Sequence, residues 1–129
     1  MERIDYFKAR LDANVSPMGY KNNPENYFLI DVRVGTDEVK KEKIPGSVEI
    51  PLDQLADRID EIPMNKSILL YCWDTWCTLA TKAAIPLLEK GYDAKELYGG
   101  LAAWKKIGFD VELLNESHSV GASEINCDC

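Results

Sequence analysis

The amino-acid sequence predicts an α/β fold, a three-layer α/β/α domain around a mainly parallel sheet of about five short strands. Two observations predict it. Short apolar segments alternate with segments of helical periodicity along the 129-residue chain, as in right-handed strand–helix–strand crossovers. Residues 27–32 are also apolar enough to be buried on both faces, as strands are between two layers of helices.

The first half of the chain is predicted to contain one helix, a loop and two strands. Apolar residues recur at helical spacing in residues 2–14, which we expect to form an amphipathic helix. Residues 18–26 are rich in Gly, Asn and Pro and are predicted to be a loop. The strand at 27–32 follows. A charged stretch over residues 35–43 and a Pro-Gly turn then lead to a second short strand at residues 47–50.

The second half continues the alternation. Leucine and isoleucine spacing predicts a short helix over residues 52–62, followed by a strand at residues 67–71. A compact loop leads to a helix at residues 78–90, ended by a glycine cap. A fourth strand at 94–98 and a helix at 101–106 are separated by a Gly-Gly turn.

Composition limits the partners and the compartment. Lys and Arg total 15 against 22 Asp and Glu, a net charge of −7, which argues against binding to nucleic acid or anionic membranes. No apolar run approaches the ~20 residues of a membrane span, and no secretory signal is expected. We therefore expect a cytoplasmic protein whose four cysteines are mostly reduced. Residues 1–114 are predicted to form one domain and residues 115–129 a flexible tail.

The segment around Cys72 carries the clearest chemical signal. Cys72 ends the strand at residues 67–71, and a short loop leads from it to a helix that opens at Thr78. Backbone N–H groups and the helix dipole favour a thiolate in such a place. Asp31 and Arg33 lie at the carboxyl end of another predicted strand, and ligands of parallel sheets bind at the carboxyl ends of the strands. The candidate site consists of Cys72 and the loop residues Trp73, Asp74, Thr75, Trp76, Cys77 and Thr78, supported by Asp31 and Arg33.

Four segments resemble the single-domain rhodanese (sulfurtransferase) family. They are LIDVR at 29–33, IPGSVEIPL at 44–52, the strand–Cys–helix unit at 71–90 and YGGLAAWKKIGFDVE at 98–112. Their order and spacing make the resemblance specific. The predicted helix at residues 2–14 and the Cys-Trp-x-x-x-Cys loop at residues 72–77 resemble a subgroup with an additional N-terminal helical segment.

The resemblance implies a ping-pong sulfur transfer. Cys72 would take sulfane sulfur from a donor as a persulfide and pass it to cyanide or a thiol. The loop at 73–77 would present backbone N–H groups as an anion cradle, and Asp31 and Arg33 would have a structural role. The family's chemistry requires neither a metal nor an organic cofactor. The residue six after Cys72 is Thr78 rather than Arg, so phosphate-ester chemistry is not expected.

Two departures from the family pattern affect the expected donor. Lys43 stands where many members have histidine. The loop contains Asp74 and no Arg or Lys, although thiosulfate-using members commonly place a cation there. A carboxylate in the pocket would raise the pKa of the Cys72 thiol and repel a dianion. We therefore expect thiosulfate to be a poor donor and a protein or low-molecular-weight persulfide to be a better one.

Several alternatives remain open at this stage. The domain is either the sulfurtransferase just described, a non-catalytic binding or regulatory module, or a thiol redox protein using Cys72 and Cys77. Cys77 either has no chemistry or resolves the Cys72 persulfide. Trp73 and Trp76 either pack on the domain or form a docking rim for a partner protein. Near the end of the chain, Cys127 and Cys129 are either incidental or relay sulfur; no pattern specifies the oligomeric state.

Overall fold

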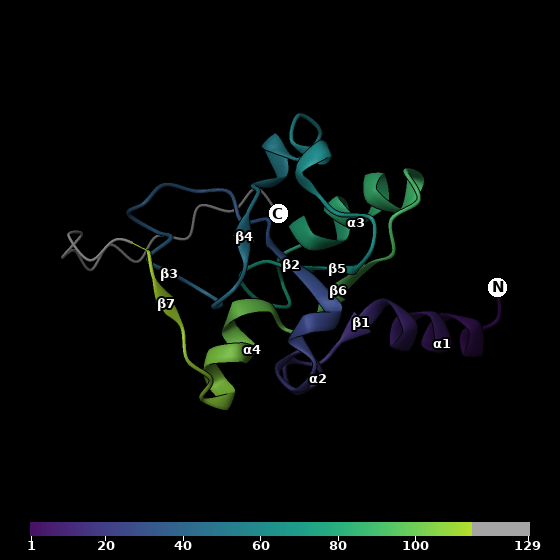
Figure 1. Cartoon of the computed structure of the whole chain (residues 1–129). Coiled ribbons are helices and arrows are strands. Elements are labelled where there is room, and N and C mark those ends of the chain that lie inside the picture. Colours follow the sequence, from purple (N-terminus) through teal and green to yellow (C-terminus); the bar gives the residue numbers. More distant parts are fainter. Residues whose placement is uncertain (115–129) are drawn as a thin grey trace.

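A computed structural model describes residues 1–114 of the chain (Figure 1). Its main sheet has five strands, and every neighbouring pair in it is parallel. In spatial order the strands are β1 (Asn14–Val15), β6 (Ala94–Leu97), β5 (Ser67–Tyr71), β2 (Tyr27–Asp31) and β4 (Val48–Glu49). The predicted α/β fold with a mainly parallel sheet is confirmed.

Helices cover both faces of this sheet. The α-helices are α1 (Arg3–Ala13), α2 (Pro17–Asn22), α3 (Leu79–Glu89) and α4 (Gly100–Ile107). One face of β5, with Leu70, packs against α3 and the segment 52–62, and the other, with Tyr71, packs against α2 and α4. Successive strand side chains point to opposite faces, so β5 supplies two separate cores. This is the expected three-layer arrangement.

The carboxyl ends of the central strands β2 and β5 lie side by side at one edge of the sheet. β2 and β5 pair in register, with Asp31 opposite Tyr71. The Val32 N–H continues the ladder by donating to the Tyr71 carbonyl oxygen at 3.1 Å. Residues that follow β2 and residues that follow β5 are therefore neighbours at the carboxyl edge of the sheet.

Helix α2 corrects the prediction of a loop at residues 18–26. The Ser16 side chain accepts a hydrogen bond from the Gly19 N–H at 3.0 Å, and Pro17 occupies the first helical position. Both features favour a helix start. Tyr20 from this helix is buried beside Trp104. The Gly, Asn and Pro content indicated a loop, but capping and core burial stabilise a short helix.

The helix predicted for residues 52–62 is also different. The segment forms two 3₁₀ helices, Leu52–Gln54 and Ile59–Glu61. Their turns close three residues apart, as in the bond from the Leu55 N–H to the Leu52 carbonyl oxygen. Leu55 and Ile62 are buried, so the apolar spacing correctly identified core residues without specifying the helix type.

Three short strands, β1, β3 and β7, were not predicted from the sequence. β3 (Glu42–Lys43) pairs antiparallel with β7 (Glu112–Leu113) in a separate two-stranded sheet. Strand β1 was missed as well. Each of these strands has two residues, too few to show a period-2 pattern.

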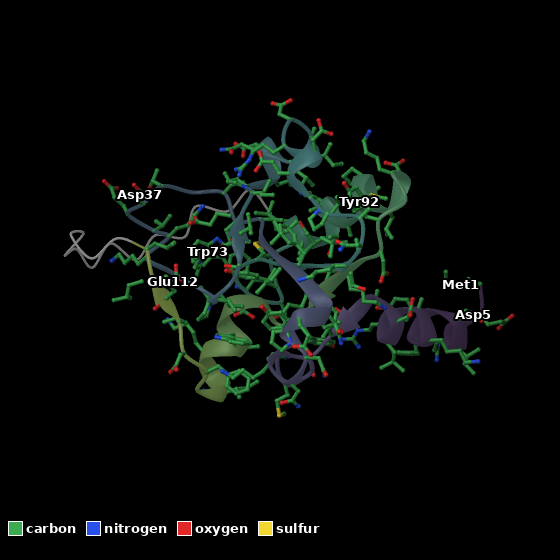
Figure 2. The ribbon with its side chains drawn as sticks, viewed as in Figure 1. Met1, Asp5, Asp37, Trp73, Tyr92 and Glu112 are labelled. Atoms are coloured by element: carbon green, nitrogen blue, oxygen red, sulfur yellow. A yellow bond between two sulfur atoms is a disulfide. The ribbon has the colours of Figure 1, made fainter. Side chains whose placement is uncertain are left out.

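The N-terminal helix is confirmed as α1, but its apolar side is not buried. Ile4, Phe7 and Leu11 are each at least half exposed. α1 contacts the rest of the domain through its last residues, and its first turns extend away from the body (Figure 2). No helix within residues 1–114 is long and apolar enough to cross a membrane.

The predictions for residues 115–129 stay predictions. The expectation of a flexible tail at residues 115–129, together with the alternatives for Cys127 and Cys129, lies outside the described residues. The domain boundary at residue 114 likewise stays a prediction.

Candidate active site

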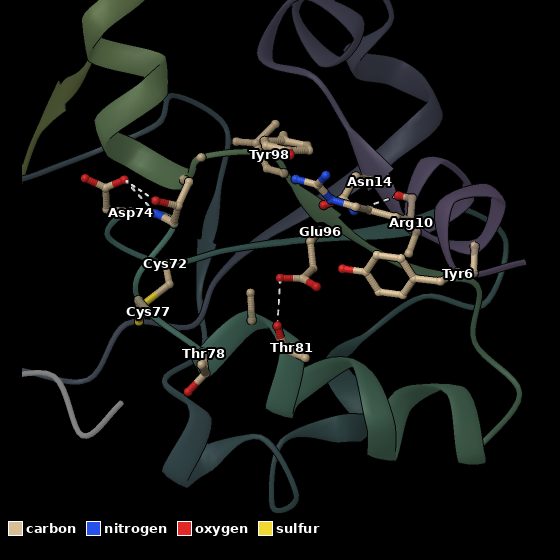
Figure 3. A pocket seen from close by; sticks show the side chains of 17 residues that line it. Tyr6, Arg10, Asn14, Cys72, Asp74, Cys77, Thr78, Thr81, Glu96 and Tyr98 are labelled. Carbon is tan, nitrogen blue, oxygen red and sulfur yellow. Dashed lines mark hydrogen bonds between the residues drawn. A yellow bond between two sulfur atoms is a disulfide. The ribbon is translucent and has the colours of Figure 1, made fainter. Parts of the chain in front are cut away.

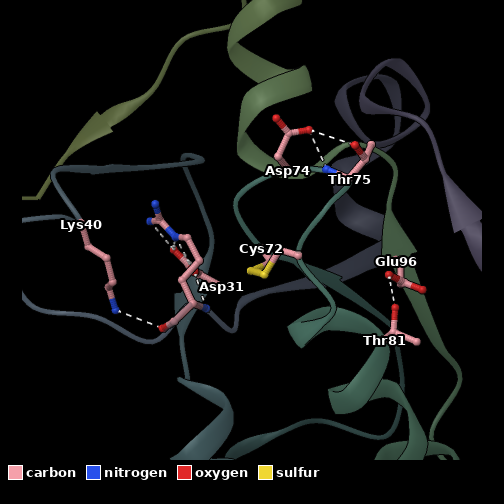
Figure 4. Close-up of a disulfide and its surroundings, with 9 residues drawn as sticks. Asp31, Lys40, Cys72, Asp74, Thr75, Thr81 and Glu96 are labelled. Atoms are coloured by element: carbon pink, nitrogen blue, oxygen red, sulfur yellow. Dashed lines mark hydrogen bonds and ion pairs between the residues drawn. A yellow bond between two sulfur atoms is a disulfide. The ribbon is translucent and has the colours of Figure 1, made fainter. Parts of the chain in front are cut away.

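Cys72 lies immediately after β5 and forms a disulfide with Cys77 (Figure 4). Their Cα atoms are 6.3 Å apart, within the range that disulfides require. Both residues are buried, with 3% and 7% of their surface exposed. The pairing differs from the reduced state that we expected for the cysteines, because the loop brings two thiols into bonding range, which sequence spacing alone does not establish.

The loop between the two cysteines is closed by its own backbone. The Cys77 N–H donates to the Asp74 carbonyl oxygen at 3.1 Å. The Thr75 N–H and hydroxyl both donate to Asp74 Oδ1, at 2.6 and 3.2 Å. Two N–H groups of the expected anion cradle are therefore used inside the loop in this disulfide form. Figure 4 shows the Asp74 carboxylate turned towards Thr75 and away from the sulfur atoms.

Helix α4 holds the start of the loop. The Leu101 N–H donates to the Cys72 carbonyl oxygen at 3.0 Å, and the Ala102 N–H donates to the Trp73 carbonyl oxygen at 2.9 Å. Gly100 makes this approach possible. It has φ of +61°, and a Cβ atom there would lie 2.5 Å from the Cys72 carbonyl oxygen. The glycine is thus required both by its conformation and by its contact with the loop.

A buried ion pair supports the other side of the loop. Arg33 Nη2 donates to Asp31 Oδ2 at 2.6 Å and to the Glu42 carbonyl oxygen at 2.7 Å. Both charged side chains are fully buried. The guanidinium carbon lies 4.4 Å from the centre of the Trp73 ring, a cation–π contact. Asp31 and Arg33 therefore link β2, β3 and the cysteine loop.

Burial and neighbouring charges change the pKa values of Arg33 and Tyr71 in this cluster. Burial alone would lower the pKa of the Arg33 guanidinium, but its hydrogen bond to Asp31 and the charge of that carboxylate together raise it. The Tyr71 hydroxyl donates to Asp31 Oδ2 at 2.9 Å. Burial, reinforced by the Asp31 charge, raises the pKa of Tyr71 far above its usual value. Arg33 and Tyr71 therefore keep their protons at neutral pH and act as fixed hydrogen-bond donors in the cluster.

A cavity of about 550 Å³ opens beside the disulfide (Figure 3). Its walls come from the cysteine loop, the start of α3, the β6–α4 connection and α1. Two side-chain contacts order its wall: the Arg10 guanidinium lies 5.1 Å from the centre of the Tyr98 ring, and the Thr81 hydroxyl donates to Glu96 Oε1 at 3.0 Å. Cys72 and Cys77 are both among the residues that line it.

The contribution of α1 to this cavity was missed by the sequence analysis. Tyr6, Ala9, Arg10 and Ala13 of α1 line it, and their spacing places them on one helix face. That spacing was a usable signal. It was overlooked because the apolar residues of the same helix indicated a core-facing side.

The remaining predicted residues have distinct positions. Trp73 is half-buried under Arg33, whereas the Trp76 side chain is 48% exposed. Thr78 occupies the N-cap position of α3, without a capping hydrogen bond from its side chain, and lines the large cavity. Lys43, which replaces the family histidine, donates to the Ser47 carbonyl oxygen at 2.7 Å. Trp104 is buried in the core.

Within residues 1–114 no group of three or more His, Cys, Asp or Glu side chains is arranged to hold a metal ion.

Comparisons with known proteins identify the family. The rhodanese-like domain matches residues 10–107, and the chain belongs to this family. It is similar to the crystal structure of a full-length protein from Lactobacillus plantarum, with 32% identity, a TM-score of 0.79, and coverage of 87% of this chain and 97% of that chain.

Two curated relatives differ in their described functions. The chain is 33% identical over 84 residues to the HTH-type transcriptional regulator Rv0324 of Mycobacterium tuberculosis, a match covering 65% of this chain and 37% of the regulator. It is 27% identical over 88 residues to a sulfurtransferase of Allochromatium vinosum, covering 67% of this chain and 79% of that protein. The match thus spans little more than a third of the regulator's length.

Proposed function

We propose that this protein is a sulfurtransferase that carries sulfane sulfur as a persulfide on Cys72 and passes it to a thiol or cyanide. The observation that carries the proposal is the position of Cys72, directly after the central strand β5 and among the residues that line the cavity of about 550 Å³. The family match and the similarity to a sulfurtransferase support it. A reducing compartment, the cytoplasm, suits this chemistry.

The reaction begins with reduction of the Cys72–Cys77 disulfide by a dithiol, which becomes a disulfide itself. The Cys72 thiolate then attacks the sulfane sulfur of the donor, and the rest of the donor leaves as a thiolate with the bonding electron pair. A nucleophilic acceptor attacks the outer sulfur of the persulfide and restores the Cys72 thiolate. The N-terminus of α3, which begins at Leu79, favours the negative sulfur in both forms.

The proposal predicts a covalent adduct. Reduced Cys77→Ser protein, which cannot re-form the 72–77 disulfide, should gain about 32 Da, the mass of one sulfur atom, when it is incubated with a sulfane-sulfur donor. The Cys72→Ser variant should gain nothing, and intact-protein mass spectrometry measures both. Absence of an adduct with every donor tried would instead favour a non-catalytic binding or regulatory module.

Thiosulfate is predicted to be a poor donor. Residues 73–78 contain no Lys or Arg, and among the described residues lining the cavity Arg10 is the single cation, against Asp74 and Glu96. We expect kcat/KM for thiosulfate to remain below ~10⁴ M⁻¹s⁻¹, the lower end for efficient enzymes, and the value for a low-molecular-weight persulfide to exceed it.

The Asp74→Asn variant separates charge from shape in this prediction. The amide oxygen can still accept from Thr75, while the negative charge is removed. If charge repels the dianion, kcat/KM for thiosulfate should rise by up to about tenfold, with a smaller rise for a singly charged persulfide. Efficient thiosulfate use by the unmodified protein would refute the donor assignment.

A further inference from the structure

We propose that Cys77 discharges the Cys72 persulfide, so that the sulfane sulfur leaves as sulfide and the Cys72–Cys77 disulfide remains. This inference rests on the proposed function, since it concerns the fate of the sulfur that Cys72 carries. It makes the protein a sulfide-releasing persulfide reductase, with a dithiol reductant as its second substrate.

The disulfide identifies which sulfur Cys77 reaches. A persulfide on Cys72 has an inner sulfur, the Sγ atom, and an outer sulfane sulfur. The structure joins the Cys77 sulfur to Cys72 Sγ itself, so the inner sulfur is the atom within reach. Attack there expels the outer sulfur, whereas attack on the outer sulfur would only move the persulfide to Cys77.

The fold keeps Cys77 in position for this step. The turn from Asp74 to Cys77 is closed by a backbone hydrogen bond of 3.1 Å. Cys77 directly precedes Thr78, which stands at the N-cap position of α3, and the helix N-terminus favours a thiolate there. α4 holds the Cys72 and Trp73 carbonyl groups from the other side. The short loop thus holds the attacking thiol near its target at high effective concentration.

Burial and loop composition disfavour a long-lived persulfide. Cys72 is 3% exposed in the structure with the 72–77 disulfide. Such burial limits attack on its sulfur by large acceptors. The Thr75 and Cys77 N–H groups are engaged by Asp74, and no cationic side chain occurs in residues 73–78. The outer anionic sulfur therefore has few fixed donors to stabilise it, and an internal thiol competes well for the persulfide.

The step balances without an outside oxidant. The Cys77 thiol gives its proton to solvent, and the thiolate forms a bond to Cys72 Sγ of the protonated persulfide. The bond from Sγ to the sulfane sulfur breaks, and that sulfur keeps its proton and leaves as HS⁻ with the electron pair. The sulfane sulfur is reduced to sulfide while the Cys77 sulfur is oxidised to the disulfide level. A dithiol then reduces the disulfide by thiol–disulfide exchange and becomes a disulfide itself.

A single-turnover experiment tests the inference. Protein reduced and freed of reductant is mixed anaerobically with glutathione persulfide, and released sulfide is measured against a Cys72→Ser blank. The unmodified protein should release about one equivalent of sulfide and form the 72–77 disulfide, detected by peptide mass spectrometry. Cys77→Ser should keep the added sulfur and release sulfide at least tenfold more slowly.

Cys77→Ala provides a second variant without a hydroxyl group, and thermal unfolding checks that both variants are folded. The inference is overturned if the unmodified protein holds its persulfide as long as the Cys77 variants do, or if the sulfur appears on Cys77 without sulfide release. In both cases loading of Cys72 would leave the proposed function intact. Failure of folded Cys77→Ser to load any sulfur would overturn the proposed function and this inference with it.

Discussion

Replacing Gly100 with alanine is expected to lower the free energy of unfolding by about 2–4 kcal/mol and to slow loading of Cys72. The new Cβ would lie 2.5 Å from the Cys72 carbonyl oxygen and 3.2 Å from the Asp74 backbone nitrogen. Neither backbone atom can move without displacing the loop, and φ of +61° is itself unfavourable for alanine. Denaturant unfolding and the rate of persulfide formation measure the two effects.

Gly108→Ala is the matched control. Gly108 also has a positive φ, +99°, but a Cβ atom there would meet nothing within 4 Å. It should cost about 1–2 kcal/mol for the backbone conformation alone and leave persulfide formation unchanged. Equal effects of the two alanines on stability and loading would show that contact with the loop is not what Gly100 provides.

Asp31→Ala is expected to destabilise the protein by about 3–5 kcal/mol, because it leaves a buried guanidinium without its counterion. Arg33 and Asp31 are both fully buried, and the Tyr71 hydroxyl would lose its acceptor as well. Since Arg33 also stacks on Trp73, we expect slower closure of the 72–77 disulfide after oxidation. Chemical denaturation and the rate of thiol loss provide the measurements.

An exposed ion pair offers the comparison. Arg58 and Glu61 form a hydrogen-bonded pair at the surface, with Nε to Oε2 at 2.9 Å. Glu61→Ala should barely change stability, because exposed pairs are screened by solvent. If Asp31→Ala proved as mild as Glu61→Ala, the buried pair would not be the support of the loop that its position indicates.

The sequence predicted the elements whose pattern is local and strong. The strand at residues 67–71 was placed correctly because its whole apolar run is buried between two layers. The helix that follows it had a clear start and a glycine stop. By contrast, the pairing of β3 with β7 joins Lys43 to Glu112 across most of the chain, and two-residue strands have no period to detect.

The residues of the candidate site were easier to predict from the sequence than the contacts between their side chains. Cys72 and its loop could be identified because a strand, a cysteine and a helix start follow one another in the chain. The stacking of Arg33 on Trp73 and the cavity wall made by Arg10 arise from residues distant in sequence. Such contacts depend on tertiary packing, and neither residue type nor spacing specifies them.

The most direct test of the central claim locates the transferred sulfur. Reduced Cys77→Ser protein, in which the internal discharge is blocked, is treated with glutathione persulfide, alkylated and digested for peptide mass spectrometry. The account predicts an additional sulfur of about 32 Da on the peptide that contains Cys72. A folded protein that carries no sulfur there, or carries it on another residue, would contradict the account.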